Sequence, residues 1–259
     1  MILGVRHGER GDRSPSEMER KRVELYFDCH LTEEGALQAQ LTGKEIQRRI
    51  IDYESSLLQT GRSSGKKIIP IILTSPFLRT IQTAYQIASS LDCIYENTIF
   101  IQDELIELLW NGQEFDIDPL PLLFSRTRKL EDFARYGLDF QNSKIKLGKD
   151  LFKSKDFLYP KYPESLEACQ ERIAIFCSKI QELFFKNFKY NEYVLIWVSH
   201  QYCLACAIWH LTGLRPDNFN DDLVELCGIL DIRYEDPDKD LEKYKVIQKG
   251  THDHLKVNL

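Results

Sequence analysis

Apolar residues in this chain gather in short runs that end abruptly at polar residues. Four such runs predict buried strands: residues 2–5, 68–74, 99–102 and 193–199. Pro70 lies near the start of its run, where a strand tolerates a missing backbone donor. Two weaker runs near the end of the chain, residues 226–234 and 244–248, predict two further strands.

Between these runs, apolar residues recur at spacings of three and four, which predicts amphipathic helices. The first covers residues 33–58, and five of its residues are expected to face inward: Leu37, Leu41, Ile46, Ile50 and Ile51. The second begins at residue 76 and turns four residues inward: Leu78, Ile81, Ile87 and Leu91. The third begins after residue 165 and turns six residues inward: Leu166, Cys169, Ile173, Phe176, Cys177 and Ile180. Residues 203–211 predict a fourth, buried helix.

Capping residues predict where the helices begin. Thr32 stands at the N-cap of the first long helix, and Ser75 at the N-cap of the second, with Pro76 at its first helical position. Ser14, followed by proline and an acidic residue, resembles a capping box that opens an exposed helix or flap over residues 18–27.

Strands that alternate with helices predict an α/β fold, here one domain over residues 1–259 with a mostly parallel central sheet and helices on both faces. Residues 113–162 show no regular period. Because a structureless loop of that length is improbable in a compact domain, we expect these residues to form an inserted lobe over one end of the sheet.

Composition narrows the class of protein. The chain has 259 residues, 43% hydrophobic and 29% charged, which is typical of a soluble globular protein, and its net charge of -6 argues weakly against a nucleic-acid partner. No apolar run reaches membrane-spanning length, and Met1 leads straight into the first strand without room for a signal peptide. The seven irregularly spaced cysteines predict reduced thiols in a cytoplasmic protein. The oligomeric state stays open.

Two short spacings resemble metal sites but have simpler explanations. Cys203 and Cys206 lie in the apolar helical run, so they are expected to pack in the core. His252 and His254 lie in the tail, which is expected to be solvated. The sequence therefore predicts neither a bound metal nor another cofactor.

The candidate chemistry lies where the strands end. Arg6 and His7 end the first strand, Arg79 falls in the first turn of the second helix, and His200 ends the most apolar strand. Carboxyl ends of parallel strands meet at one edge of a sheet, where ligands bind. A guanidinium holds an anion, and a neutral imidazole nitrogen attacks it. Taken singly, Arg79 is also explained by a surface ion pair and His200 by a structural hydrogen bond.

The order of these motifs resembles the histidine phosphatase superfamily, the phosphoglycerate-mutase-like group. The resemblance spans about residues 2–230 and is carried by five motifs: Arg6-His7-Gly8-Glu9, Leu31-Thr32-x-x-Gly35-x-x-Gln38-Ala39, Ser75-Pro76-x-x-Arg79-Thr80-x-x-Thr83-Ala84, Leu105-x-Glu107 and Val198-Ser199-His200. Arg10 and Asp12 extend the first motif toward the form found in the suppressor-of-T-cell-receptor-signalling and ecdysteroid-phosphate phosphatases. No adaptor domain of the former accompanies it here.

The resemblance implies a phosphoglycerate-mutase-like fold and a metal-independent phosphomonoester hydrolase. It implies that His7 is the nucleophile that becomes phosphohistidine, and that four side chains hold the phosphoryl oxygens: Arg6, Arg10, Arg79 and His200. Glu107 is implied to be the general acid. Gln201 departs from the family, since many members have glycine there, and the residues around Trp110 do not match the mutase pattern.

Three functions stay open at this point: the phosphatase, a phosphoglycerate or phosphosugar mutase of the same fold, and a catalytically silent binding or scaffold protein. The third is disfavoured because every charged group that the chemistry needs is present. The general acid is Glu107 or its neighbour Glu104. Apolar neighbours should desolvate Glu107, whereas Glu104 follows Asp103 and is expected to be solvated or to cap a turn. The substrate, a phosphorylated small molecule or phosphoprotein, depends on the lobe at 113–162.

Overall fold

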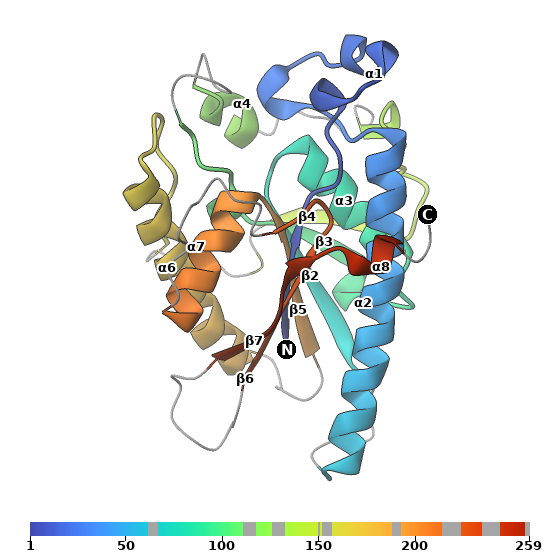
Figure 1. The fold of residues 1–259 in the computed structure, drawn as a ribbon, viewed down its shortest axis with the longest axis vertical. Helices are drawn as coiled ribbons and strands as arrows, with labels where there is room; N and C mark the ends of the chain where they lie inside the picture. The colour runs from blue at the N-terminus through green and yellow to red at the C-terminus, as the bar shows by residue number, and fades with distance from the viewer. Residues whose placement is uncertain are drawn as a thin grey trace.

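The computed structural model describes residues 1–61, 67–110, 118–125, 133–149, 151, 157–187, 193–213, 224–234 and 244–256. Within this part of the chain, seven strands form one sheet in the order β4-β3-β2-β5-β1-β6-β7 (Figure 1). Their bounds are β1 (Ile2–Arg6), β2 (Ile69–Thr74), β3 (Thr98–Ile101), β4 (Lys146–Lys149), β5 (Tyr193–Ser199), β6 (Ile229–Tyr234) and β7 (Tyr244–Thr251). The first five strands in this order, from β4 to β1, run parallel, and only β6 runs in the opposite direction, pairing antiparallel with both β1 and β7. The predicted mostly parallel sheet is therefore confirmed.

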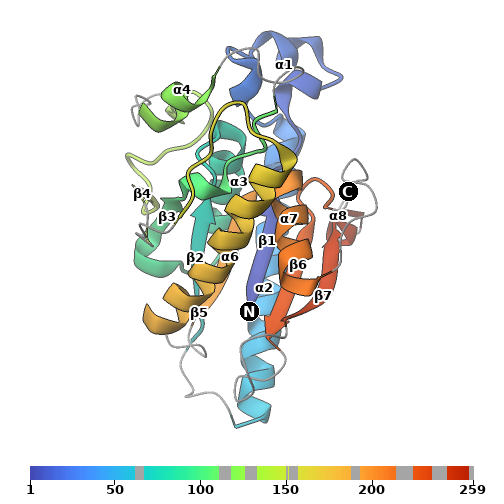
Figure 2. The ribbon, with the colours of Figure 1, turned by 90° about the vertical axis from the view of Figure 1, so that its left-hand side faces the viewer.

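Helices cover both faces of the sheet, as predicted (Figures 1 and 2). Those described are α1 (Glu17–Lys21), α2 (Glu33–Gln59), α3 (Leu78–Ser89), α4 (Leu120–Ser125), α6 (Leu166–Asn187), α7 (Gln201–Thr212) and α8 (Asp253–Lys256). One core cluster lies between the sheet and α2 and α3, and another lies between the sheet and α6 and α7. In β5, Val194, Ile196 and Val198 enter the first cluster, whereas Leu195 and Trp197 enter the second. Because both faces of β5 are buried, its sequence is a continuous apolar run.

The inward face of α2 differs from the prediction. Leu37 and Ile51 are 40% and 50% exposed, although Ile46 and Ile50 are buried as expected. The remaining buried positions are mostly small: Gly35, Ala39, Thr42 and Gly43. A Cβ atom on Gly43 would lie 2.9 Å from the backbone of Ile87 in α3. The prediction was wrong at Leu37 and Ile51 because part of the buried face of α2 consists of small residues in close contact with neighbouring segments, which a count of apolar residues does not detect.

Two predicted caps are wrong. Phe77, not Ser75, is the N-cap of α3, and the Leu78 N–H instead donates to the Asp28 carboxylate at 2.6 Å. Helix α1 begins after Ser16 without a side-chain cap, and Ser14 Oγ accepts from Ser16 N. The Thr32 cap is confirmed, because its hydroxyl accepts from the Gly35 N–H at 2.9 Å.

Residues 253–256, close to the end of the chain, form a helix that the sequence did not predict. This helix, α8, packs on α2, and His254 Nε2 lies 2.8 Å from the Thr42 hydroxyl. The prediction of a solvated tail was therefore wrong. Cys203 and Cys206 are buried in the core as expected.

The predicted lobe over residues 113–162 contains both regular elements and residues outside the described part of the chain. Residues 146–149 form β4, an edge strand of the main sheet that the sequence pattern did not predict. Helix α4 lies with α1 at the end toward which β1 runs (Figure 1). Among the described residues, no helix combines the length and apolar character needed to cross a membrane.

Candidate active site

His7 lies in the turn that follows β1, with its side chain buried. Its backbone N–H donates to the Ser199 carbonyl at the end of β5, which continues the parallel ladder. Its Nδ1 lies 2.8 Å from the Gly8 carbonyl oxygen. Because a carbonyl only accepts, Nδ1 carries the proton, and the lone pair of the neutral ring is on Nε2.

The turn that carries His7 is held by the start of α2. A Cβ atom on Gly8 would lie 2.4 Å from the Gly35 carbonyl oxygen, and one on Gly35 would lie 2.4 Å from the Glu9 carbonyl oxygen. Thr32 donates its hydroxyl to the Glu9 carboxylate at 2.7 Å, and Gln38 Oε1 accepts from the Glu9 N–H at 3.1 Å. The motif at residues 31–39 therefore positions the nucleophile turn by close backbone contact.

His200 lies beside His7 at the same edge of the sheet, with ring centroids 5.3 Å apart. Its Nε2 is 2.9 Å from Ser75 Oγ. Its Nδ1 is 3.3 Å from a terminal nitrogen of Arg79 and 3.5 Å from Glu107 Oε2. The predicted junctions at His7, Ser75 and His200 thus meet at one edge. The role of Ser75 as a partner of His200 was missed because its sequence context suggested a helix cap.

Three arginines surround the two histidines, and each is held by a second contact. Arg79 is buried and donates to the Phe27 carbonyl at 2.9 Å. Arg6 donates to the Val224 carbonyl at 2.9 Å.

Arg10 binds both oxygens of Asp12 through Nε and Nη2, at 2.9 and 2.8 Å. Burial opposes ionisation of Asp12, but the hydrogen bonds from Arg10 outweigh it and hold the pKa of this carboxyl below its usual 3.8. Asp12 was not singled out from the sequence as the partner of Arg10, although its place two residues after Arg10 is the signal that identifies it.

Both histidines are neutral in this environment. Burial lowers the pKa of His7 well below 6.5, and the charges of Arg79 and Arg6 lower it further. Burial likewise lowers the pKa of His200, with Arg79 and His7 as the next causes. The contact between His200 and Glu107 is therefore not an ion pair.

Glu107, not Glu104, reaches His200. Glu107 Oε1 accepts from the Leu108 N–H at 2.9 Å, which leaves Oε2 toward His200. Glu104 is 2% exposed, and its carboxylate accepts from Gln102 at 2.6 Å. The expectation of a solvated Glu104 was wrong, because the turn Asp103–Leu105 folds inward and Arg172 binds the Glu104 carbonyl.

The site contains no cluster typical of a metal centre. Across the described residues, no group of three or more histidine, cysteine, aspartate or glutamate side chains could hold a metal ion. The arrangement instead gathers two neutral imidazoles, three guanidiniums and a carboxyl group, which suits the binding of a dianion.

Comparison with known proteins shows the fold. No protein-family model matches the sequence, and no curated protein matches it. A solved phosphoserine phosphatase of Entamoeba histolytica, a mutant form in complex with phosphoserine, is 15% identical, with a TM-score of 0.53 and 98% of both chains covered.

The ecdysone phosphate phosphatase of Bombyx mori, solved with tungstate, is 18% identical, with a TM-score of 0.55 over 95% of this chain and 91% of that one. A putative α-ribazole-5'-P phosphatase of Escherichia coli is 18% identical, with a TM-score of 0.52 over 97% and 96% of the two chains. The chain therefore has the phosphoglycerate-mutase-like fold of these phosphatases, as its motifs predicted.

Proposed function

We propose that this protein is a phosphomonoester hydrolase that works without a metal and passes through a phosphohistidine at His7. The observation that carries the proposal is the hydrogen bond from His7 Nδ1 to the Gly8 carbonyl. It fixes the neutral tautomer and puts the nucleophilic lone pair on Nε2, beside His200.

The reaction proceeds in two displacements. In the first, Nε2 of His7 attacks phosphorus, the bond to the alcohol oxygen breaks, and Glu107 gives a proton to the departing oxygen. In the second, water attacks the phosphohistidine, returns a proton to Glu107 and releases inorganic phosphate and neutral His7. Glu107 ends each cycle protonated, so protons balance.

The three arginines supply the positive charge that phosphoryl transfer requires. Arg6, Arg10 and Arg79 bind the non-bridging oxygens, and neutral His200 adds a hydrogen bond to them. Their charges also lower the pKa of His7, which keeps the nucleophile unprotonated in the absence of substrate.

The structures of similar fold bear the names of phosphatases of small phosphorylated molecules, which favours hydrolysis over the mutase alternative. We infer a phosphorylated small molecule or phosphoprotein as substrate, selected by the lobe at residues 113–162. The seven free thiols fit a cytoplasmic location.

The test is turnover of p-nitrophenyl phosphate with EDTA present. We expect the native chain to be active, His7→Ala to be inactive, and quenched native enzyme to carry acid-labile phosphate. The binding or scaffold alternative requires no turnover of any phosphomonoester. Isomerisation of a phosphoglycerate faster than its hydrolysis would establish the mutase instead.

A further inference from the structure

Glu107 lies in a segment whose course is not set by an α-helix or a strand. This segment follows β3 and contains one short 3-10 turn, Asp103–Leu105, before it continues as irregular backbone. Such backbone lacks the ladder that pairs carbonyls in a sheet or an α-helix, so its buried carbonyls need other donors. We call residues 104–107 the acid segment. The side chains that bind its carbonyls fix its course.

Arg172 of α6 binds two carbonyls of the acid segment. Its Nη1 donates to the Glu104 carbonyl and, at 3.2 Å, to the Ile106 carbonyl. The Ile106 carbonyl belongs to the planar peptide group that also contains the Glu107 nitrogen. Arg172 therefore restrains the backbone directly at Glu107.

Glu164 fixes the orientation of Arg172. Nε and Nη2 of Arg172 donate to the two Glu164 oxygens at 2.8 and 2.7 Å, and the two side chains are 1% and 3% exposed. Because the guanidinium is planar, this bidentate contact also sets the direction of Nη1. The Glu164 backbone N–H donates to the Leu109 carbonyl at 2.9 Å. One ion pair thus contacts the chain on both sides of Glu107.

Ser199 and Cys203, which flank His200 in the sequence, bind the same segment. Ser199 Oγ donates to the Leu105 carbonyl at 2.8 Å. Cys203 Sγ donates to the Ile106 carbonyl at 2.8 Å. The acid segment is therefore held between α6 and the elements that carry His200.

A contribution to core stability alone does not account for this arrangement. Replacement of a buried ion pair by apolar residues is often neutral or stabilising, so the pair is weak evidence for stability. We propose that Arg172, oriented by Glu164, is a positioning residue that holds Glu107 where it gives its proton to the departing oxygen. This inference rests on the proposed phosphatase function.

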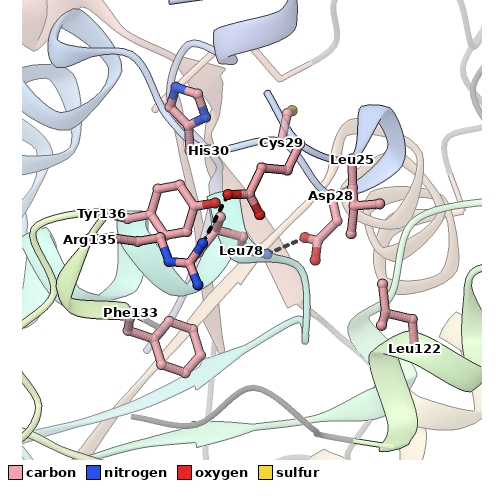
Figure 3. Close-up of a pocket in the computed structure, with 10 residues that line it drawn as sticks. Leu25, Asp28, Cys29, His30, Leu78, Leu122, Phe133, Arg135 and Tyr136 are labelled. Carbon is pink, nitrogen blue, oxygen red and sulfur yellow. Dashed lines mark hydrogen bonds and ion pairs between the residues drawn. The ribbon is translucent and has the colours of Figure 1, made fainter. Parts of the chain in front are cut away.

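The support of Arg79 is separate from the support of Glu107. Residues 27–28 hold Arg79 and the start of α3, beside a cavity of about 180 Å³ (Figure 3). Among the described residues that line this cavity, none belongs to the acid segment, α6 or α7. Changes at Arg172 are therefore expected to displace the acid and to leave phosphate binding by Arg79 intact.

Replacement of the ion pair as a unit tests the proposal. Arg172→Met with Glu164→Met leaves no unpaired buried charge, so we expect the chain to fold. The kcat/KM for n-propyl phosphate should fall about tenfold more than that for p-nitrophenyl phosphate, whose leaving group needs little protonation. The inhibition constant of inorganic phosphate should change by less than about twofold. Equal falls in kcat/KM for the two substrates would overturn the proposal.

Arg172→Lys decides the question if the paired variant does not fold. Lysine keeps the charge opposite Glu164, but its single ammonium group cannot replace both bonds of the fork and also reach two carbonyls. The ratio of the two kcat/KM values should fall by about three- to tenfold. In a Glu107→Gln background, Arg172→Lys should change the ratio by less than about twofold, because no acid remains to be misplaced. Equal falls in the two backgrounds would show that Arg172 does not act through Glu107.

Ile180→Ala is the matched control for general destabilisation of α6. Ile180 is buried about two turns beyond Arg172, and its truncation leaves a cavity beside the same helix. The ratio of the two kcat/KM values should stay within about twofold of the native one. A fall as large as that in Arg172→Lys would assign the effect to a weakened helix and overturn the proposal.

Hydrogen exchange separates a failure of this inference from a failure of the proposed function. The Leu108 N–H donates to Glu107 Oε1, so its exchange reports whether the carboxyl stays in place. Arg172→Lys should speed this exchange about tenfold and leave the amides of β5 unchanged. Unchanged exchange at Leu108 would overturn the inference. A native chain that hydrolyses neither phosphate would refute the proposed function, whereas faster exchange would still show that Arg172 holds Glu107.

Discussion

At the scale of single residues, Glu107 and Glu104 give the sharpest contrast, because only one of them faces His200. We expect Glu107→Gln to slow hydrolysis of an alkyl phosphate by roughly 100-fold, since the alkoxide leaves without a proton. The loss on p-nitrophenyl phosphate should be less than about tenfold, because nitrophenolate is a good leaving group. Initial rates on the two substrates measure the difference.

Glu104→Gln is the matched control for this experiment. It alters the buried bond with Gln102, so it should lower the free energy of unfolding by about 1–2 kcal/mol without changing the ratio of the two rates. Equal losses on both substrates in Glu107→Gln would show a structural role and refute its assignment as the acid.

The sequence singled out Glu107 by its apolar neighbours, and the structure places it, buried, beside His200, while its role as the acid stays a prediction. The sequence could not reveal which residues Glu104 and Ser75 contact. Glu104 is buried by a turn and by the distant Arg172, and Ser75 is turned toward a histidine 125 residues away. Contacts between segments far apart in the chain leave no local pattern, so these two assignments required the structure.

At the scale of elements, the contact between α2 and the His7 turn is testable at one glycine. Gly35→Ala would place a Cβ atom 2.4 Å from the Glu9 carbonyl oxygen, so the turn must move away from α2. We expect unfolding free energy to fall by about 1–3 kcal/mol. Activity should fall as well, because displacement of the turn misplaces His7. Urea unfolding and p-nitrophenyl phosphate turnover measure the two effects.

Ala36→Gly, one residue further along α2, separates the packing effect from helix propensity. It should lower the unfolding free energy by about 1 kcal/mol and leave turnover unchanged, since it adds no atom near the turn. A fully active Gly35→Ala protein would mean that α2 does not position the nucleophile.

Elements were predictable where their sequence pattern reflects burial. β5 is buried on both faces and was delimited correctly by its apolar run. β4 has the sequence Lys146-Leu147-Gly148-Lys149 and lies at the exposed edge of the sheet, so it carries no comparable signal. α2 was found at nearly its true length, but its buried face includes small residues that contact several segments: Gly35 lies against Glu9, Thr42 binds the Cys227 carbonyl, and Gly43 lies against α3.

At the scale of the whole molecule, burial of neutral histidines links the candidate site to acid stability. His7 and His200 have pKa values held well below 6.5 by burial, and burial lowers that of His254 to about 4. In the unfolded chain each imidazole titrates near 6.5. Below about pH 6.5 the unfolded state therefore binds protons that the folded state excludes, and stability falls as pH falls.

The unfolding free energy is predicted to fall, as pH is lowered from about 6.5, by up to about 1.4 kcal/mol per pH unit for each such histidine. His200→Asn removes one of these groups, so its unfolding free energy should fall less steeply than that of the native chain between about pH 6.5 and 5, whatever its stability at neutral pH. Urea unfolding at several pH values gives both slopes, provided that the m-value stays constant. Parallel curves would mean that His200 is protonated in the folded protein; the Glu107 contact would then be an ion pair, and Glu107 would not be available as the acid.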